Sequence, residues 1–316
     1  MDSLTQERIV ERTQPAARRV FPRHGWVGLV LIAVFWPVNW LLEGSRTAYA
    51  FFPLWLGYSL VVDALAYRQN GSSLLSRSGK RYAALFLIAS PGWWLFEAVN
   101  LRVENWQYAG SGAFSSLEYV LLASLNFSVV MPAVFGAAEW FAGMGWIQRM
   151  QRGLIVRKDR VTTLSFFAAG WIMLVLMILW PRIFFPFVWL SVYFIVEPIN
   201  VWLGNRTLAD GAQHGDWRPI ISLFAGALFT GFFWEMWNYY SYPKWVYHVP
   251  FVDFWRIFEM PLLGYGGYLP FSLELHAIYY FVIGLFGRGQ SRYLLPMFTS
   301  TDTRSPGDEK ETRSGR

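Results

Sequence analysis

Two glutamate–asparagine pairs with the same spacing stand in apolar parts of the sequence, each close to tryptophan and tyrosine. Glu97 precedes Asn100 by three residues, and Glu235 precedes Asn238 by the same interval. Residues three apart share one face of a helix, so each pair can point together into a helical bundle. A carboxyl group removed from water there can hold and deliver a proton near neutral pH. Both pairs are therefore candidate acid/base groups.

The chain that follows the second pair carries further polar side chains, among them Lys244 and Glu259. For this reason we expect the second pair to mark the catalytic centre, and the first to help bind the substrate. The expected catalytic residues are Glu235, Asn238, His248 and Glu274. The expected substrate-binding residues are Glu97, Asn100, Trp245 and Tyr247. The alternative role of both pairs is structural, in which each polar pair at a helix end holds the next loop through its tryptophan.

Metal and cofactor sites have little support in the sequence. Glu274 and His276 are two residues apart and would face different sides of a helix. The four histidines form no zinc-binding motif, and the chain has no cysteine. The glycine-rich run 264–267 indicates a turn before the last helix. We therefore predict no metal ion and no cofactor.

The composition indicates that these residues belong to a membrane protein. Only 15% of the residues are charged, against about 25% in an ordinary soluble domain. Aromatic residues make up 19% of the chain, and Trp and Tyr gather at membrane interfaces. The segments long and apolar enough to span a bilayer are 26–43, 51–67, 82–100, 117–146, 163–182, 184–203, 219–238 and 267–286. The sequence thus predicts an all-α integral membrane fold with about eight transmembrane helices.

Three segments are expected to depart from straight spans. Pro132 and Gly136 predict a kink in the fourth span. The short connection from Pro181 to Pro186 predicts a tight hairpin between the fifth and sixth spans. The segment 239–267 is too apolar for an ordinary loop, which indicates an interfacial or re-entrant lid.

The cations in the loops predict the orientation. Of the 27 Lys and Arg residues, 22 fall in the segments on the same side as the N-terminus. This distribution indicates a plasma (inner) membrane protein with both termini in the cytoplasm. The same distribution of cations explains the net charge of +6, so no nucleic-acid partner is expected. The expected partners are the bilayer and a hydrophobic small molecule or lipid. Residues 1–24 and 289–316 are predicted to be cytoplasmic tails, the first basic and the second disordered.

The second half of the chain repeats motifs of the first half in the same order. The run Phe96-Glu97-x-x-Asn100-x5-Trp106-x-Tyr108 recurs as Trp234-Glu235-x-x-Asn238-x6-Trp245-x-Tyr247. In the same register, Asp63 corresponds to Glu197, and Pro132 to Pro270. We predict a parallel tandem repeat of two four-helix units, 25–148 and 161–288, related by a pseudo-two-fold axis along the membrane normal. A functional site is expected between the two halves or within one of them.

Part of the second half resembles a known family. The residues from Glu235 through Trp245-Val246-Tyr247 to Gly267-Tyr268-Leu269-Pro270-Phe271-Ser272-Leu273-Glu274 resemble the small integral-membrane lycopene cyclase domain. This chain has the single Glu274 where that family has two adjacent carboxylates. The resemblance implies redox-neutral cyclisation of a polyene, in which a carboxylic acid protonates an alkene and aromatic faces stabilise the cation.

Three classes of function remain open. The favoured one is an intramembrane enzyme, cyclase- or isomerase-like, that uses acid/base carboxylates on an isoprenoid, carotenoid or other lipid. The second is a transporter or flippase with a carboxylate-lined path, in which Asp63 and Glu197 could relay protons or cations. The third is a non-catalytic membrane assembly factor, because every motif also has a packing role.

Overall fold

Long apolar helices make up most of residues 20–294, the part of the chain that the computed structural model describes. Within it, seven helices are long and apolar enough to cross a membrane, and a bent pair raises the number to eight. The seven are α2 (Arg23–Leu41), α3 (Thr47–Asn70), α5 (Gly79–Val103), the α6–α7 unit (Ser116–Phe127 and Val130–Ala142), α8 (Arg160–Leu179), α12 (Arg218–Tyr239) and α13 (Tyr268–Leu285, preceded by η5, Leu262–Gly267). The prediction of a mainly helical membrane protein is confirmed. Most of the two predicted tails lies outside the described residues.

Two of the predicted spans are broken. α6 ends at Phe127 and α7 begins at Val130. Pro132 has no N–H group to donate to the carbonyl of Ser128, so the helical hydrogen bonding is interrupted there, where a kink was expected. The sixth span, expected from residue 184, becomes regular only in α10 (Ser191–Trp202), after α9 (Pro181–Phe184) and the 3-10 helix η4 (Phe185–Trp189). Pro181 begins α9 and Pro186 is the second residue of η4. These two short helices form the connection of the hairpin, in which α8 packs against α10 as expected.

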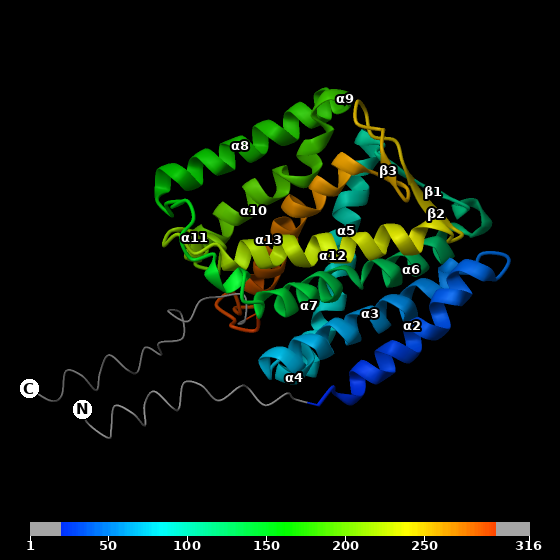
Figure 1. The fold of residues 1–316 in the computed structure, drawn as a ribbon. Coiled ribbons are helices and arrows are strands. Elements are labelled where there is room, and N and C mark those ends of the chain that lie inside the picture. The colour runs from blue at the N-terminus through cyan, green and yellow to red at the C-terminus, as the bar shows by residue number, and fades with distance from the viewer. Residues whose placement is uncertain (1–19, 295–316) are drawn as a thin grey trace, which may run out of the picture.

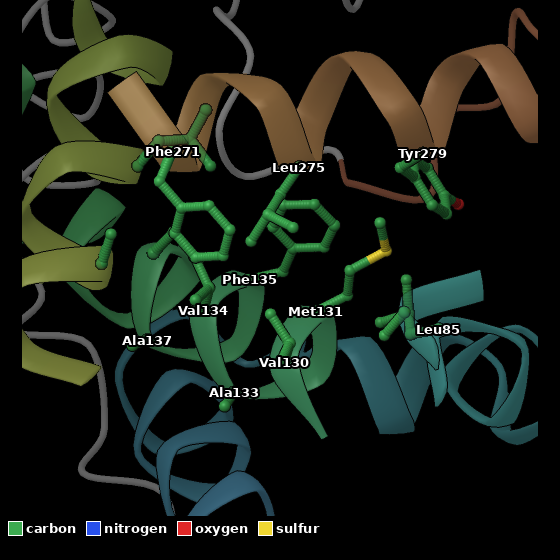
Figure 2. Close-up of a cluster of buried hydrophobic side chains, with 14 of the residues drawn as sticks. Leu85, Val130, Met131, Ala133, Val134, Phe135, Ala137, Phe271, Leu275 and Tyr279 are labelled. Carbon is green, nitrogen blue, oxygen red and sulfur yellow. The ribbon is translucent and has the colours of Figure 1, made fainter. Parts of the chain in front are cut away.

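α7 forms the centre of the hydrophobic core. Every residue from Val130 to Glu139 is buried, which is the pattern of a helix surrounded by other helices. Figure 2 shows this helix between Phe271, Leu275 and Tyr279 of α13 on one side and Leu85 of α5 on another. The core therefore joins the N-terminal and C-terminal halves of the chain.

The helices of the two halves pair in matching ways (Figure 1). α2 lies along α3, and α8 lies along α10; α3 packs on α7, and α10 packs on α13. Glycine permits the closest of these approaches. A Cβ atom built on Gly28 of α2 would lie only 2.6 Å from the carbonyl oxygen of Gly57 in α3, and one on Gly170 of α8 would lie 2.8 Å from a backbone atom of Phe194 in α10.

Short strands add to the expected all-α fold. In the described part of the chain, β1 (Trp106–Ala109) pairs antiparallel with β2 (Lys244–Tyr247), and β3 (Arg256–Ile257) pairs with β4 (Met260–Pro261). Trp106 lies opposite Tyr247, and Tyr108 lies opposite Trp245. The segment expected to be an interfacial or re-entrant lid thus contains β2, β3 and β4, and β2 joins it to the first half of the chain.

The opposite end of the helices carries short helical turns. α4 (Leu74–Arg77) follows α3, and α11 (Ala209–Ala212) follows α10, both far from β1 and β2 in Figure 1. Two further 3-10 turns lie in connections: η2 (Ser111–Ala113) follows β1, and η3 (Ile147–Arg149) follows α7. Asp63 accepts hydrogen bonds from the Ser73 hydroxyl (2.7 Å) and the Leu75 N–H group (2.9 Å), and Glu197 accepts one from Leu208 N–H (2.6 Å). Both acids therefore hold the start of the short helix that follows.

Candidate functional site

A cavity of about 480 Å³ lies beside β1 and β2, with walls from both halves of the chain. Pockets of about 300–1,000 Å³ with mostly apolar walls are typical of small-molecule sites. Aromatic rings dominate these walls, including Trp93, Trp106, Trp189, Trp234, Trp245 and Phe271. The hydroxyl-bearing residues Tyr108, Tyr247 and Tyr268 also line it. The cavity therefore suits an apolar ligand that meets a few polar groups.

Glu97 lies behind the cavity wall in the first half of the chain. Its Oε1 atom accepts hydrogen bonds from the Trp93 indole N–H (2.8 Å), the Trp106 indole N–H (3.0 Å) and the Tyr108 hydroxyl (2.6 Å). Glu97 is thus held as a hydrogen-bond acceptor by the rings that face the ligand space.

Glu235 occupies the matching place in the second half and is fully buried. Its Oε1 atom accepts hydrogen bonds from the hydroxyls of Tyr247 (2.8 Å) and Tyr268 (2.6 Å). Its Oε2 atom has no hydrogen-bond partner within residues 20–294. A buried carboxyl oxygen without a partner is costly unless it carries a proton or meets a ligand. The Trp245 indole lies beside this carboxyl group, which stands behind the cavity wall.

The tyrosines in the two strands remain neutral donors. Burial raises the pKa of Tyr108 well above its usual value of 10.0, and the adjacent Glu97 raises it further. Burial and Glu235 have the same effect on the pKa of Tyr247. Both hydroxyls therefore keep their protons at physiological pH and donate hydrogen bonds to the carboxyl groups of Glu97 and Glu235.

Asn100 and Asn238 fix the strands rather than facing the cavity. The Asn238 amide donates to the Trp245 carbonyl (2.7 Å) and accepts from the Trp245 N–H group (3.0 Å). Asn100 makes the same two bonds with Trp106, at 2.8 and 3.3 Å. This is the structural role that the sequence left open for the asparagines, and it positions both tryptophans.

We expect Asn238→Asp to lower the stability of the protein by about 1–3 kcal/mol, because a carboxylate oxygen would then face the Trp245 carbonyl. The thermal midpoint in detergent, followed by tryptophan fluorescence, measures this loss. Gln107→Glu makes the same chemical change on an exposed strand position and serves as the control. Equal midpoints for the two variants would contradict the role of Asn238.

His248 and Glu274 are not among the described residues that line the cavity. The His248 side chain is exposed, and its backbone N–H group donates to the carbonyl of Asn105 (2.9 Å). Glu274 is fully buried in α13, beside the backbone N–H groups of Val192 and Tyr193 at the start of α10. Trp245 and Tyr247 line the cavity, and Glu97 and Glu235 stand behind its wall, where they accept hydrogen bonds from the lining tyrosines Tyr108 and Tyr247. His248 and Glu274 make their contacts elsewhere.

Sequence reasoning gave no site role to Tyr108, Tyr268 or Trp189. Tyr108 belongs to the repeated motif and could have been included for that reason. Tyr268 reaches Glu235 from the start of α13, and Trp189 stacks on Trp106 from the broken sixth span, with ring centroids 5.7 Å apart. Their contributions depend on packing between distant helices, for which the sequence carries no local pattern.

The helices and the cavity together indicate a class of protein, a helical multi-pass membrane protein with an apolar cavity. Within the described residues, no three or more His, Asp or Glu side chains gather as metal ligands. Comparison of the chain with protein-family models, with curated proteins and with solved structures found no match. The functional argument therefore rests on the site itself.

Proposed function

We propose that this chain is an intramembrane enzyme that performs redox-neutral acid/base chemistry on an isoprenoid, carotenoid or related lipid. The observation that carries the proposal is the fully buried Glu235 carboxyl group, which accepts hydrogen bonds from Tyr247 and Tyr268, two residues that line the aromatic cavity. The resemblance of residues 235–274 to the small lycopene cyclase domain supports the same class of reaction.

In the proposed reaction, the Glu235 carboxylic acid gives the proton on Oε2 to a carbon–carbon double bond of the lipid. The double bond's electron pair forms the new C–H bond, and the positive charge moves to the neighbouring carbon. The faces of Trp234 and Trp245 stabilise this charge. Loss of a proton from an adjacent carbon to the Glu235 carboxylate then restores a double bond and gives an isomer of the substrate. Where a second double bond of the lipid first attacks the cation, its electron pair forms a carbon–carbon bond, and the same proton loss gives a ring form.

The alternative of a transporter has less support. Asp63 and Glu197, the expected relay residues, each bind the start of a short helix, which gives both a structural task. An assembly factor would need no aromatic cavity with a buried carboxyl group behind its wall. The enzyme therefore remains the best account of the site.

We further propose that the two halves are a parallel tandem repeat of four-helix units. The pairing of β1 with β2 supports this, because the two copies of the Trp-x-Tyr motif face each other symmetrically around Gln107 and Val246. The matching contacts of α2 with α3 and of α8 with α10 support it as well. The cavity would then lie at the interface of the repeats.

The loop charges support an inner-membrane location with both termini in the cytoplasm. Arg46, Arg102, Arg182, Lys244 and Arg256 are the cations in the connections at the strand end of the helices. The other 22 Lys and Arg residues fall in segments assigned to the cytoplasmic side. In this orientation, the cavity lies near the outer face of the membrane.

We expect Glu235→Gln to abolish the lipid or pigment product while the protein still folds. Glutamine keeps an oxygen for Tyr247 and Tyr268 but cannot deliver the proton, and loss of a general acid lowers rates by about 10²–10⁴. Extracts of cells that carry the wild-type gene, the deletion or the variant are compared by mass spectrometry. Product formation and the amount of protein in the membrane are measured together.

Glu118→Gln is the matched control, since Glu118 is exposed on α6 away from the site. It should retain the product. A Glu235→Gln variant with normal product would contradict the proposal. Disappearance of that variant from the membrane would assign Glu235 to folding instead.

A further inference from the structure

The lid segment, residues 249–263 between β2 and η5, carries apolar side chains on both of its faces. On the inner face, the residues that line the cavity include Val249, Val252 and Met260. The outer face, which does not line the cavity, exposes three aromatic side chains: Phe251 (73%), Phe254 (44%) and Trp255 (77%). Exposed apolar patches of this kind mark a contact with a partner or with a membrane.

The backbone of the lid segment has a conformation that bulky residues rarely adopt. The φ angles of Phe251, Trp255 and Phe258 are 64°, 49° and 58°. Positive φ strains a residue with a bulky side chain, and such strain is retained where the local arrangement serves a function. Phe251 and Trp255 are therefore kept on the outer face in spite of a backbone cost.

The contacts of Phe258 show how deep the lid segment lies. Its ring contacts the rings of Phe232 and Tyr239 in α12, with centroids 5.6 and 5.7 Å apart. Phe232 stands seven residues before Tyr239, the last residue of α12, which is about 10 Å along the helix axis. Because α12 is one of the helices apolar enough to cross a membrane, the lid segment lies alongside the end of a span and not beyond it.

The charged side chains of the lid segment are Asp253, Arg256 and Glu259, and all three are in ion pairs. Arg256 pairs with Asp253 (2.5 Å) and with Glu259 (3.6 Å). Glu259 also pairs with Lys244 of β2. Two cations and two anions cancel, so apolar contact, and not attraction to anionic lipid, must hold the segment at a membrane. Charged pairs also fit the level of the head groups better than the hydrocarbon centre, where charge is costly.

We propose that the lid segment lies in the bilayer interface at the strand end of the helices, with Phe251, Phe254 and Trp255 in contact with lipid, and that the cavity opens to the lipid. Tryptophan is favoured at this depth because its ring is amphipathic. Leu263 lines the cavity and is also 59% exposed, so it stands at the cavity edge. An apolar ligand then enters from the bilayer without crossing water. This inference is independent of the proposed function, because it holds whatever reaction the cavity serves.

The chain has no cysteine, so a single nitroxide label can be attached at a chosen residue. Phe251→Cys, Trp255→Cys and Leu263→Cys carry it in turn, in the full-length protein in phosphatidylcholine nanodiscs. Electron paramagnetic resonance measures collisions with oxygen, which concentrates in lipid, and with a water-soluble nickel chelate. The oxygen-to-nickel ratio should be severalfold higher at all three positions than at Glu43→Cys, in the connection between α2 and α3 at the same end. Ile172→Cys, on the exposed face of α8, gives the value for a lipid-facing span.

Nickel collisions as frequent as at Glu43→Cys would overturn the inference, because the lid segment would then face water. A water-like ratio at Leu263→Cys alone would reject the opening of the cavity to lipid. Low collision rates with both reagents would show cover by protein, such as a second copy of the chain, and would also overturn it. A high oxygen ratio that appears only after addition of phosphatidylglycerol would replace the apolar contact by an electrostatic one.

A second measurement decides the matter if the cysteine variants do not reach the membrane. The fluorescence that Trp255 contributes is the difference between the wild type and Trp255→Phe, which keeps an aromatic ring. Phosphatidylcholine with brominated acyl chains should quench this difference, because the indole lies among lipids. A difference that is not quenched would contradict the inference.

Discussion

Arg77→Met is expected to destabilise the protein by about 3–5 kcal/mol, because it leaves the carboxylate of Glu139 buried without a counter-charge. The Arg77 guanidinium forms an ion pair with Glu139, which is fully buried. It also donates to the Tyr293 carbonyl (2.8 Å) and to the Ser72 hydroxyl (3.1 Å), and its charged end lies over the Tyr293 ring. One side chain thus joins α4, α7 and the segment after α13.

The double variant Arg77→Met/Glu139→Gln separates charge from packing. It removes the unpaired charge, so it should regain more than half of the stability lost in Arg77→Met. Thermal midpoints of the purified proteins in detergent give the comparison, with Glu139→Gln alone as the third corner of the cycle. If the double variant is no more stable than Arg77→Met, the loss comes from the contacts with Tyr293 and not from the buried charge.

Gly28→Ala is expected to cost about 3 kcal/mol, at the upper end of the usual range for overpacking. The new methyl group would lie 2.6 Å from the Gly57 carbonyl oxygen, and a backbone atom cannot turn aside as a flexible side chain can. α2 and α3 must therefore separate along their shared face. Cell-surface labelling and protease sensitivity report this separation, together with the thermal midpoint.

The control for this prediction is Gly145→Ala. A Cβ atom at Gly145 meets no atom within 4 Å among the described residues. The control should therefore match the wild type. Equal behaviour of both glycine variants would show that α2 and α3 tolerate a wider spacing than the structure gives them.

The helical spans were predictable from the sequence because a membrane helix is specified by the composition of about 20 consecutive residues. The span predicted at 163–182 corresponds to α8, Arg160–Leu179. The strands were not predictable in this way. β1 and β2 are four residues each, and each is stabilised by a partner in the other half of the chain, so neither has a local pattern that distinguishes it from a loop.

The site was predictable only in part, for a related reason. The repeated motif selected Glu235 and Tyr247, which form a hydrogen bond in the structure. The same motif selected Asn238 as a catalytic residue and left a structural role open; the amide bonds to the Trp245 backbone, which is the structural role. Proximity in sequence suggested His248, which lies one residue beyond β2 and has an exposed side chain.

The register of β1 and β2 has a consequence for the origin of the protein. Trp106 opposite Tyr247 and Tyr108 opposite Trp245 is the arrangement that a strand makes with an identical copy of itself across a two-fold axis. On the proposed duplication, this register would descend from a homodimer of four-helix subunits, whose two copies of the strand paired across the two-fold axis before the genes were fused.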